Sequence, residues 1–482
     1  MGSSMNFLRS TFILLTLYTS VLYPDDAYRA FTDSRGWILE ARIESITGTS
    51  VRLEDRQGKI FEVPLENLSP PDQAFIRLSP KNDSPRRPAF TESTETPDQI
   101  RLNHLAGRPV FLASDLWTVS ADQVAAVLSC KRESQTAFSS SFRLYPGQNY
   151  ILFGANPKSV SVYGDGEGNL TSISLIYANK GDFLADGTKE LPKDAAALST
   201  AVHDDYTAIR RRLGIMFEES VRVRFGEGSS RTAYERWDWN GHAFLLQIEP
   251  GEFVSLLVVP SSSVDRQGGL PGINLRELQD TLKNNVVVKE NQDILITNIP
   301  MVDQGAKGYC LPATAERVLR YMNIQADMYR IAMEANTDND GTYTDNLIDV
   351  IRSDVRRRGL KIHPFSGPLE PGKLMTFLQR GIPVFWHLSS TNAFHAFSLE
   401  HTHQRNTIQS RDAWAEYVQQ ISSELHFQKN DTRTHMNLII GYNPVTDEIC
   451  YTDSWGISYK ERWAPRVLAE QVSYGEFFVI DF

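Results

Sequence analysis

Hydrophobic and polar residues alternate with a period of two near the N-terminus, in three short runs at 38–46, 50–54 and 60–63. The segments between the runs, ITGTS and DRQGK, carry the glycine and polar residues typical of hairpin turns. After the last run, LSPPDQAFI has the serine and prolines that favour the start of a short helix. The pattern predicts a small, strongly twisted β-barrel at 28–79.

Between 100 and 289 the pattern changes to a mixture of helical and hairpin segments. The segments SADQVAAVLSC and ALSTAVHDDYTAIRRRLGIMF have apolar residues at helical spacing, whereas VSVYGDGEGNLTSISLIYA and HAFLLQIEPGEFVSLLVVP alternate around glycine-rich turns. This predicts an α+β domain of unknown role. Residues 80–99, rich in Pro, Ser and Thr, are predicted to be the linker that separates it from the barrel.

From 290 to 482 a last domain is predicted, in which the chemically active residues gather. A helical pattern begins at Cys310, after Gly305 and Gly308, and Pro312 fits the first turn of a helix. Farther along the chain, runs at 436–442 and 448–452 are joined by NPVTD, a turn sequence, and predict a hairpin.

The N-terminus has the pattern of an export signal. Arg9 precedes an apolar run from Phe12 to Tyr23, which is too short for a comfortable membrane span and fits the apolar region of a signal peptide. Residues 1–27 are therefore predicted to be a signal peptide or an N-terminal anchor. The expected location is secreted, periplasmic or in the cell envelope, with the N-terminus as the means of envelope association.

Composition removes several classes of function. The 482 residues carry a net charge of −10 with no dense Lys/Arg run, so no nucleic-acid partner is expected. The three cysteines are too few and too far apart for a disulfide framework or a paired zinc site, and no metal or cofactor is predicted. Cys130 and Cys450 are predicted to lie in hydrophobic cores.

Cys310 is the candidate nucleophile. The N-terminus of a helix lowers the pKa of a thiol because its unpaired N–H groups and its dipole favour negative charge. Most free cysteines are small buried hydrophobes, so this position alone does not establish catalysis. The predicted hairpin adds His435 at the start of its first strand and Asp453 just after its second, and the two ends lie side by side. An imidazole can take the thiol proton while a carboxylate fixes the ring.

These motifs resemble the papain-like cysteine peptidases of the bacteriocin-processing, double-glycine type. The matching stretches, all between about 296 and 482, are QGAKGYCLPAT, LQRGIPVFWHL, HMNLIIGYNP and YTDSWG. The resemblance implies that Cys310 is the nucleophile, His435 the general base and Asp453 the orienting group. It also implies that Gln304 is the side-chain donor of the oxyanion hole, with the Cys310 backbone N–H as the other donor.

The same resemblance assigns further positions. Trp455 corresponds to the indole that shields the His–Asp contact, and Gly308 and Tyr309 are expected to bind substrate or shield the site. Residues 389–434 are longer than a minimal domain needs, and RDAWAEYVQQISSELHF within them predicts an amphipathic helix that could lie over the cleft. Four histidines in or near this segment match no strong metal-ligand spacing, and we interpret them as surface or cleft-wall residues; they are His387, His395, His401 and His403.

The N-terminal barrel resembles the SH3-like modules related to the first homology domain of an actin-patch adaptor, through TDSRGWILEARI, VRLEDRQGKIFEVPLENLS and DQAFI. The predicted fold is therefore α+β and multidomain, with an SH3-like β-barrel, a central α+β domain and a C-terminal papain-like domain. The predicted function is that of an exported bacterial cysteine peptidase acting on a peptide or protein substrate, with the oligomeric state left open. Two alternatives remain: a catalytically silent papain-like module that binds peptides or cell-wall polymer, and a thioester-forming acyl transferase.

Overall fold

A computed structural model describes residues 29–32, 38–47, 49–55, 60–69, 72–73, 76, 95–185, 194–217, 219–228, 231–265, 274–338, 341–408, 410–430 and 434–482. The chain divides into two compact units, Met1–Thr94 and Glu95–Phe482. The predicted signal peptide or anchor at 1–27, and most of the predicted linker, lie outside the described residues. Within the part of the chain that is described, no helix combines the length and apolar character needed to cross a membrane.

In the first unit the alternating runs form a four-stranded antiparallel sheet. Its strands, hydrogen-bonded in sequence order, are β1 (Arg29–Thr32), β2 (Ile38–Thr47), β3 (Ser50–Asp55) and β4 (Ile60–Pro64). Because successive side chains point to opposite faces, one face carries the buried residues Phe31, Ala41, Val51 and Leu53. Strands β2, β3 and β4 lie where the sequence pattern placed them, β1 was not predicted, and closure into an SH3-like barrel stays a prediction.

The middle part of the second unit is an eight-stranded antiparallel sheet made of two four-stranded meanders. Its strands are β5 (Lys131–Gln135), β6 (Ser139–Leu144), β7 (Ser159–Asp165), β8 (Leu170–Asn179), β9 (Val221–Phe225), β10 (Thr232–Trp239), β11 (His242–Glu249) and β12 (Phe253–Pro260). The order is β5-β6-β7-β8-β12-β11-β10-β9, so the meanders meet where β8 pairs with β12. This confirms mixed helix and sheet in the middle of the chain.

Helices flank this sheet and follow each of its meanders. They are α2 (Pro97–Ala106), α3 (Ala121–Val127), α4 (Lys180–Ala185), α5 (Ala195–Met216) and α6 (Ser261–Asp265). The two short ones are equivalent in position, because α4 follows β8 directly and α6 follows β12 directly. The start of α2 corrects the predicted linker, which was expected to run to 99. Thr96 and Gln99 form a capping box and Pro97 occupies the first turn, so the helix begins inside the predicted linker.

The C-terminal part contains a second antiparallel sheet in the order β13-β14-β17-β16-β20-β15, with β18 paired to β17 and β19. Its strands are β13 (Val286–Val288), β14 (Ile294–Ile296), β15 (Lys361–Ser366), β16 (Val384–Ser389), β17 (Thr434–Asn443), β18 (Glu448–Thr452), β19 (Arg462–Pro465) and β20 (Ser473–Asp481). Its helices are α7 (Leu275–Asn284), α8 (Cys310–Tyr321), α9 (Met328–Glu334), α10 (Thr344–Arg357), α11 (Pro371–Leu378), α12 (Asn392–Arg405), α13 (Arg411–Glu424) and α14 (Arg466–Val472).

The boundary predicted at residue 290 lies too late in the chain. Leu278 and Leu282, four residues apart on one face of α7, are buried in the C-terminal core, and β13 belongs to the C-terminal sheet. The helix was assigned to the middle part because nothing in its sequence tells which core its apolar face joins.

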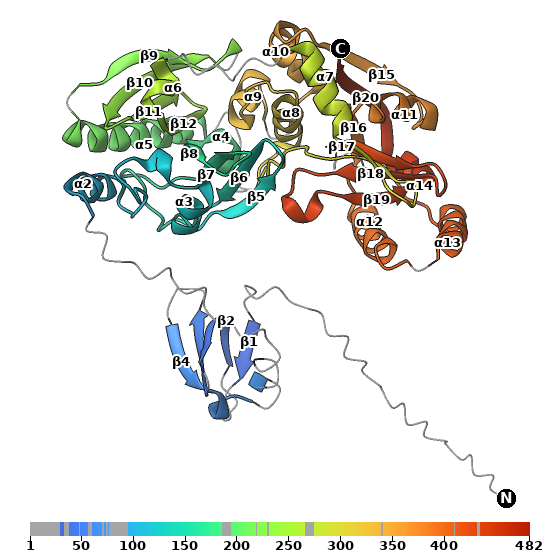
Figure 1. The fold of residues 1–482 in the computed structure, drawn as a ribbon, viewed down its shortest axis with the longest axis horizontal. Coiled ribbons are helices and arrows are strands. Elements are labelled where there is room, and N and C mark those ends of the chain that lie inside the picture. Colours follow the sequence, from blue (N-terminus) through green and yellow to red (C-terminus); the bar gives the residue numbers. More distant parts are fainter. Residues whose placement is uncertain are drawn as a thin grey trace, which may run out of the picture. The chain divides into compact units, whose positions relative to one another are not determined.

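Helices α8 and α9 of the C-terminal part lie beside the middle part (Figure 1). The two parts share an apolar cluster. Ile176 of β8 and Phe253 of β12 contact side chains from the segment before α8, from α8 itself and from α9. The residues contributed by the C-terminal part are Val302, Tyr309, Ala313, Met328, Tyr329 and Ala332. Residues on both sides of Cys310 therefore help to form the boundary between the two parts.

Candidate active site

The three cysteines lie in different environments. Cys130 and Cys450 are buried, as predicted, and burial raises the pKa of Cys130 to about 12 and that of Cys450 well above its usual value. Cys310 is partly exposed and is the first residue of α8. Burial raises the pKa of Cys310, but a hydrogen bond to His435 and the charge of that imidazole lower it by more, so its net shift is downward. Of the three thiols, Cys310 is the one whose pKa is lowered.

The hairpin of β17 and β18 brings His435 and Asp453 together. Leu438 pairs with Thr452, so the first residues of β17 lie beside the turn that follows β18. His435 Nε2 is 2.7 Å from Asp453 Oδ1, which leaves Nδ1 as the ring nitrogen that can exchange a proton with Cys310. Both side chains are buried, and Asp453 is fully so. The structure therefore joins the predicted thiol, imidazole and carboxylate in one chain of contacts.

The charges in this chain stabilise one another. Burial lowers the pKa of His435, but the Asp453 carboxylate and its hydrogen bond, together with Cys310, raise it to about 10. Burial raises the pKa of Asp453, and the neighbouring His435 and Arg462 lower it by more. The shifts of Cys310 and His435 have opposite signs, and both favour a thiolate beside an imidazolium at neutral pH.

Arg462, which was not predicted, completes the surroundings of the carboxylate. Its Nη2 donates to Asp453 Oδ2, and its Nη1 donates to His395 Nδ1 at 2.7 Å. The Trp455 ring packs against the His435 imidazole at a tilt, with centroids 4.7 Å apart, and His395 makes an edge contact with the same indole at 5.1 Å. Trp455 therefore lies beside the imidazole of His435, and its role as a shield of the His–Asp contact stays a prediction. His395 contacts both Arg462 and Trp455.

One face of α8 ties the thiol to the turn that carries Asp453. Thr314 and Arg317 follow Cys310 by one and two helical turns, and both are buried. Thr314 Oγ1 lies 3.2 Å from Ser454 Oγ, while Arg317 donates to Thr452 Oγ1 at 2.7 Å and to Ser454 Oγ at 3.3 Å. The spacing of these polar residues in the sequence could have indicated this contact.

Gln304 lies in the segment before the helix, with its backbone N–H donating to the Ser454 carbonyl at 2.9 Å. Its side-chain Nε2 donates to the Lys307 carbonyl at 2.9 Å. A primary amide has two N–H bonds, so a second donor remains for a ligand. The Gln304 side chain is buried, and its hydrogen bond to the Lys307 carbonyl fixes the orientation of the amide group.

Of the two neighbours of Cys310 expected to bind substrate or shield the site, one is placed differently. The Tyr309 side chain is buried in the cluster between the middle and C-terminal parts, where its ring meets Tyr329 at 5.8 Å. It therefore does not shield the thiol, because its large apolar ring is more stable in that cluster than beside solvent. At Gly308 an added Cβ would meet no heavy atom within 4 Å, so open space adjoins the backbone next to Cys310.

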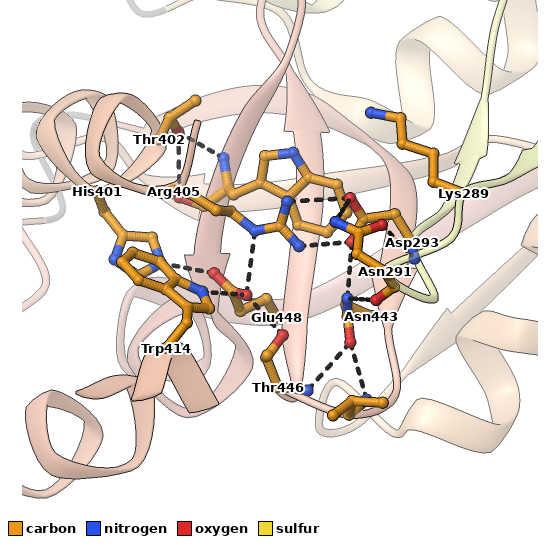
Figure 2. A network of polar contacts seen from close by, with 12 residues as sticks. Lys289, Asn291, Asp293, His401, Thr402, Arg405, Trp414, Asn443, Thr446 and Glu448 are labelled. Atoms are coloured by element: carbon orange, nitrogen blue, oxygen red, sulfur yellow. Dashed lines mark hydrogen bonds and ion pairs between the residues drawn. The ribbon is translucent and has the colours of Figure 1, made fainter. Parts of the chain in front are cut away.

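The predicted helix over the cleft, α13, is held at the far end of β18 instead. Trp414 Nε1 of α13 donates to Glu448 Oε2 at 3.1 Å, and Glu448 is the first residue of β18, whereas Asp453 follows the last. Figure 2 shows the network around this glutamate. His401 Nε2 of α12 lies 2.7 Å from Glu448 Oε1, and Arg405 bridges Glu448 and Asp293. His401 is buried here, which corrects its prediction as a surface or cleft-wall residue.

The comparisons with known proteins concern this C-terminal part. Residues 296–477 match the model of the Peptidase_C39 like family. The crystal structure of the peptidase domain of Streptococcus ComA, a bi-functional ABC transporter involved in a quorum sensing pathway, is similar at 11% identity. That similarity covers 38% of this chain and 96% of the domain, with a TM-score of 0.24. A double glycine motif protease from an AMS/PCAT transporter, crystallised with the leader peptide, is similar at 14% identity over 38% of this chain and 90% of that one, also with a TM-score of 0.24.

None of the curated proteins compared with the chain matches it. The family match covers the segment that holds Cys310, His435 and Asp453, and it confirms the family resemblance that the sequence predicted for this region. The C-terminal part of the chain is therefore similar to the Peptidase_C39 like family, a family of the cysteine-peptidase type.

Proposed function

We propose that the chain is a cysteine peptidase that hydrolyses peptide bonds through Cys310, His435 and Asp453. The observation that carries the proposal is the position of His435 between the thiol and the carboxylate, with Nε2 bound to Asp453 and a hydrogen bond to Cys310. A buried imidazole held by a carboxylate is the arrangement that activates a thiol for attack on a carbonyl. A protein that only binds peptides has no use for this polarisation of the thiol.

The proposed reaction has two halves, acylation of Cys310 and hydrolysis of the resulting thioester. The Cys310 thiolate attacks the substrate carbonyl carbon, and the resulting oxyanion accepts hydrogen bonds from the Cys310 backbone N–H and from the second N–H of Gln304 Nε2. His435 then gives its proton to the leaving amine, and a thioester remains. Water attacks that thioester while His435 takes a proton, and the acid product leaves with the thiol restored. Asp453 keeps its charge throughout and stabilises the imidazolium.

The proposed substrate is a peptide or protein segment in extended form. The open space beside Gly308 is where its backbone would approach the thiol, because Tyr309 turns away from the site. The protease crystallised with the leader peptide gives a precedent for peptide substrates in a similar domain.

The test is a digest of a peptide library by the full chain, analysed by mass spectrometry. We expect Cys310→Ala to abolish cleavage and Cys130→Ala, a change at a buried thiol of the middle part, to retain it. Cleavage by Cys310→Ala would refute the proposal. Adding a small amine separates hydrolysis from acyl transfer, because transfer adds the mass of the amine to the acid product.

We also propose that the chain is exported and that its first unit is an SH3-like module. Export is supported by Arg9 and the apolar run from Phe12 to Tyr23, and the module by the four-stranded antiparallel sheet together with its turn sequences. N-terminal sequencing of protein recovered from the envelope and medium of an expressing bacterium tests the first point. Protein confined to the cytoplasm would contradict it.

A further inference from the structure

The segment 301–309, which carries Gln304 and ends beside Cys310, is held by side chains of the middle part. The contacts include those of four residues of that part: Glu133 of β5, Tyr145 just after β6, and Gly181 and Asp182 of α4. We call them the loop clamp.

Asp303, the residue before Gln304, is held through both its backbone N–H and its backbone carbonyl. Its N–H donates to Glu133 Oε1 at 2.7 Å, and its carbonyl accepts from the Tyr145 hydroxyl. Glu133 is itself fixed, since it is buried and pairs with Arg143 Nε at 2.5 Å. The backbone on the N-terminal side of Gln304 therefore has its direction set by the middle part.

Lys307 fixes the other side of the segment. Its side chain is fully buried, and its Nζ lies 3.0 Å from Asp182 Oδ1 and 4.4 Å from the centroid of the Tyr145 ring. The backbone carbonyl of the same lysine accepts the hydrogen bond from Gln304 Nε2. A buried ammonium is stable only when its charge is compensated, and this carboxylate comes from the middle part. The position of the Gln304 amide thus depends on Asp182 through Lys307.

The Tyr309 ring fits against α4 because Gly181 of that helix has no side chain. A Cβ added to Gly181 would lie 2.5 Å from Tyr309 Cζ, and the Gly181 backbone hydrogen-bonds the phenol. A residue with any side chain would push the Tyr309 ring, and with it the N-terminus of α8, away from its present place. The three contacts together hold the residues on each side of the oxyanion donors.

We propose that the loop clamp consists of positioning residues for the active site, so that the middle part is a working component of the peptidase. The inference rests on the proposed function. The clamp acts on the geometry of the Gln304 amide and the Cys310 backbone N–H, which stabilise the oxyanion, and leaves the Cys310–His435–Asp453 contacts untouched. A small misplacement of such donors lowers the rate of the chemical step more than the binding of substrate.

The experiment compares Tyr145→Phe and Asp182→Asn in the full chain with Asp265→Asn. The control removes a carboxylate from α6, the helix equivalent to α4, where Asp265 pairs with Arg236 at 2.8 Å. We expect each clamp variant to lower kcat about tenfold with KM unchanged within about twofold. The rate of Cys310 alkylation by iodoacetamide should stay at the wild-type value, because alkylation needs the thiolate but no oxyanion hole. The control should match wild type in all three quantities.

Hydrogen–deuterium exchange of 301–309, measured without substrate on the same samples, separates this inference from the proposed function. We expect faster exchange in both clamp variants and wild-type exchange in Asp265→Asn. Folded clamp variants with wild-type kcat and wild-type exchange would overturn the inference. If wild type cleaves no peptide, the proposed function fails, and the exchange result still decides whether the clamp positions the segment. If Asp182→Asn does not fold, Tyr145→Phe carries the test, since it removes a single hydroxyl.

Discussion

Replacing Asp453 with asparagine removes the negative charge that lies between His435 and Arg462. The His435 Nε2 to Asp453 Oδ1 distance of 2.7 Å places the centres of the two charges about 4 Å apart, which corresponds to about 4 kcal/mol at an effective dielectric constant of about 20. At about 1.4 kcal/mol per pKa unit, the pKa of His435 should fall by about 3 units.

The loss should appear as a slower reaction of the thiol at low pH. With the imidazolium less stable, the ratio of the thiolate–imidazolium pair to the neutral pair falls by up to about 10³. Alkylation of Cys310 by iodoacetamide at pH 6, followed by intact mass and peptide mapping, should be at least about tenfold slower than in wild type. The two rates should converge above pH 9, where the thiol ionises in both proteins, and kcat/KM for peptide cleavage should fall by about 10² or more.

Asp447→Asn is the matched control. It makes the same change of charge on the same hairpin, at the end opposite Asp453, where Asp447 pairs with Arg466 at 2.8 Å. Its φ of 51° suits asparagine, so the turn should keep its conformation. Alkylation and cleavage should match wild type in this variant. If Asp453→Asn reacted at pH 6 as fast as Asp447→Asn, the carboxylate would have no part in forming the ion pair and the reasoning would be wrong.

Three further predictions test other parts of the site and fold. Gly308→Ala should leave the melting temperature unchanged, because the new Cβ meets nothing, but should raise KM about tenfold if substrate occupies that space; an unchanged KM would contradict this. Hydrolysis should follow a bell-shaped pH profile, rising through the lowered pKa of Cys310 and falling as His435 loses its proton near pH 10; a single limb rising above pH 9 would contradict it. In chemical denaturation Glu448→Gln should lose about 3–5 kcal/mol of unfolding free energy, whereas Arg352→Met, at an exposed pair, should lose less than about 0.5; a loss below about 1 kcal/mol in the former would contradict the buried network.

The same ion pair affects stability with a definite sign. The pKa of His435 is higher in the folded chain than its usual 6.5, so its contribution is complete below pH 6.5 and is lost as the pH rises through about 10. The pKa of Asp453 is lowered, so its contribution is present above its usual 3.8 and is lost as the pH falls through the folded value. Both contributions are present between about pH 4 and 6.5.

The site elements that the sequence predicted are those whose geometry is local. The turn NPVTD joins two alternating runs, so the hairpin follows from neighbouring residues, and with it the meeting of His435 and Asp453. The start of α8 follows from glycines before Cys310 and a proline in its first turn. Short-range rules determined these features, because few alternative pairings exist for so short a turn.

Residues whose contacts depend on strand or helix packing outside the predicted hairpin were not predicted. Arg462 lies on β19 and contacts Asp453 because β18 pairs with β19. No local sequence pattern predicts that pairing. An arginine has the same appearance in a sequence whether it covers a solvated face or sits beside a buried carboxylate. For the same reason the sequence did not show that Glu448, Arg405 and Asp293 form a buried network and are not exposed to solvent. Because this network was not foreseen, α13 was expected over the cleft.

The polar segment around Gln304 is another case in which the sequence does not show whether polar residues are exposed or buried. Its sequence, DQGAKG, suggests an exposed loop, yet Gln304 and Lys307 are both buried, and the middle part supplies the carboxylate that pairs with Lys307. One side of the segment before Cys310 is therefore closed by the middle part, and Tyr309 points into that contact. The open space adjoining the thiol lies at Gly308. If the chain cleaves peptides, the substrate must approach from the Gly308 side, and a bulky side chain there should block cleavage while leaving the Cys310–His435 pair reactive toward iodoacetamide.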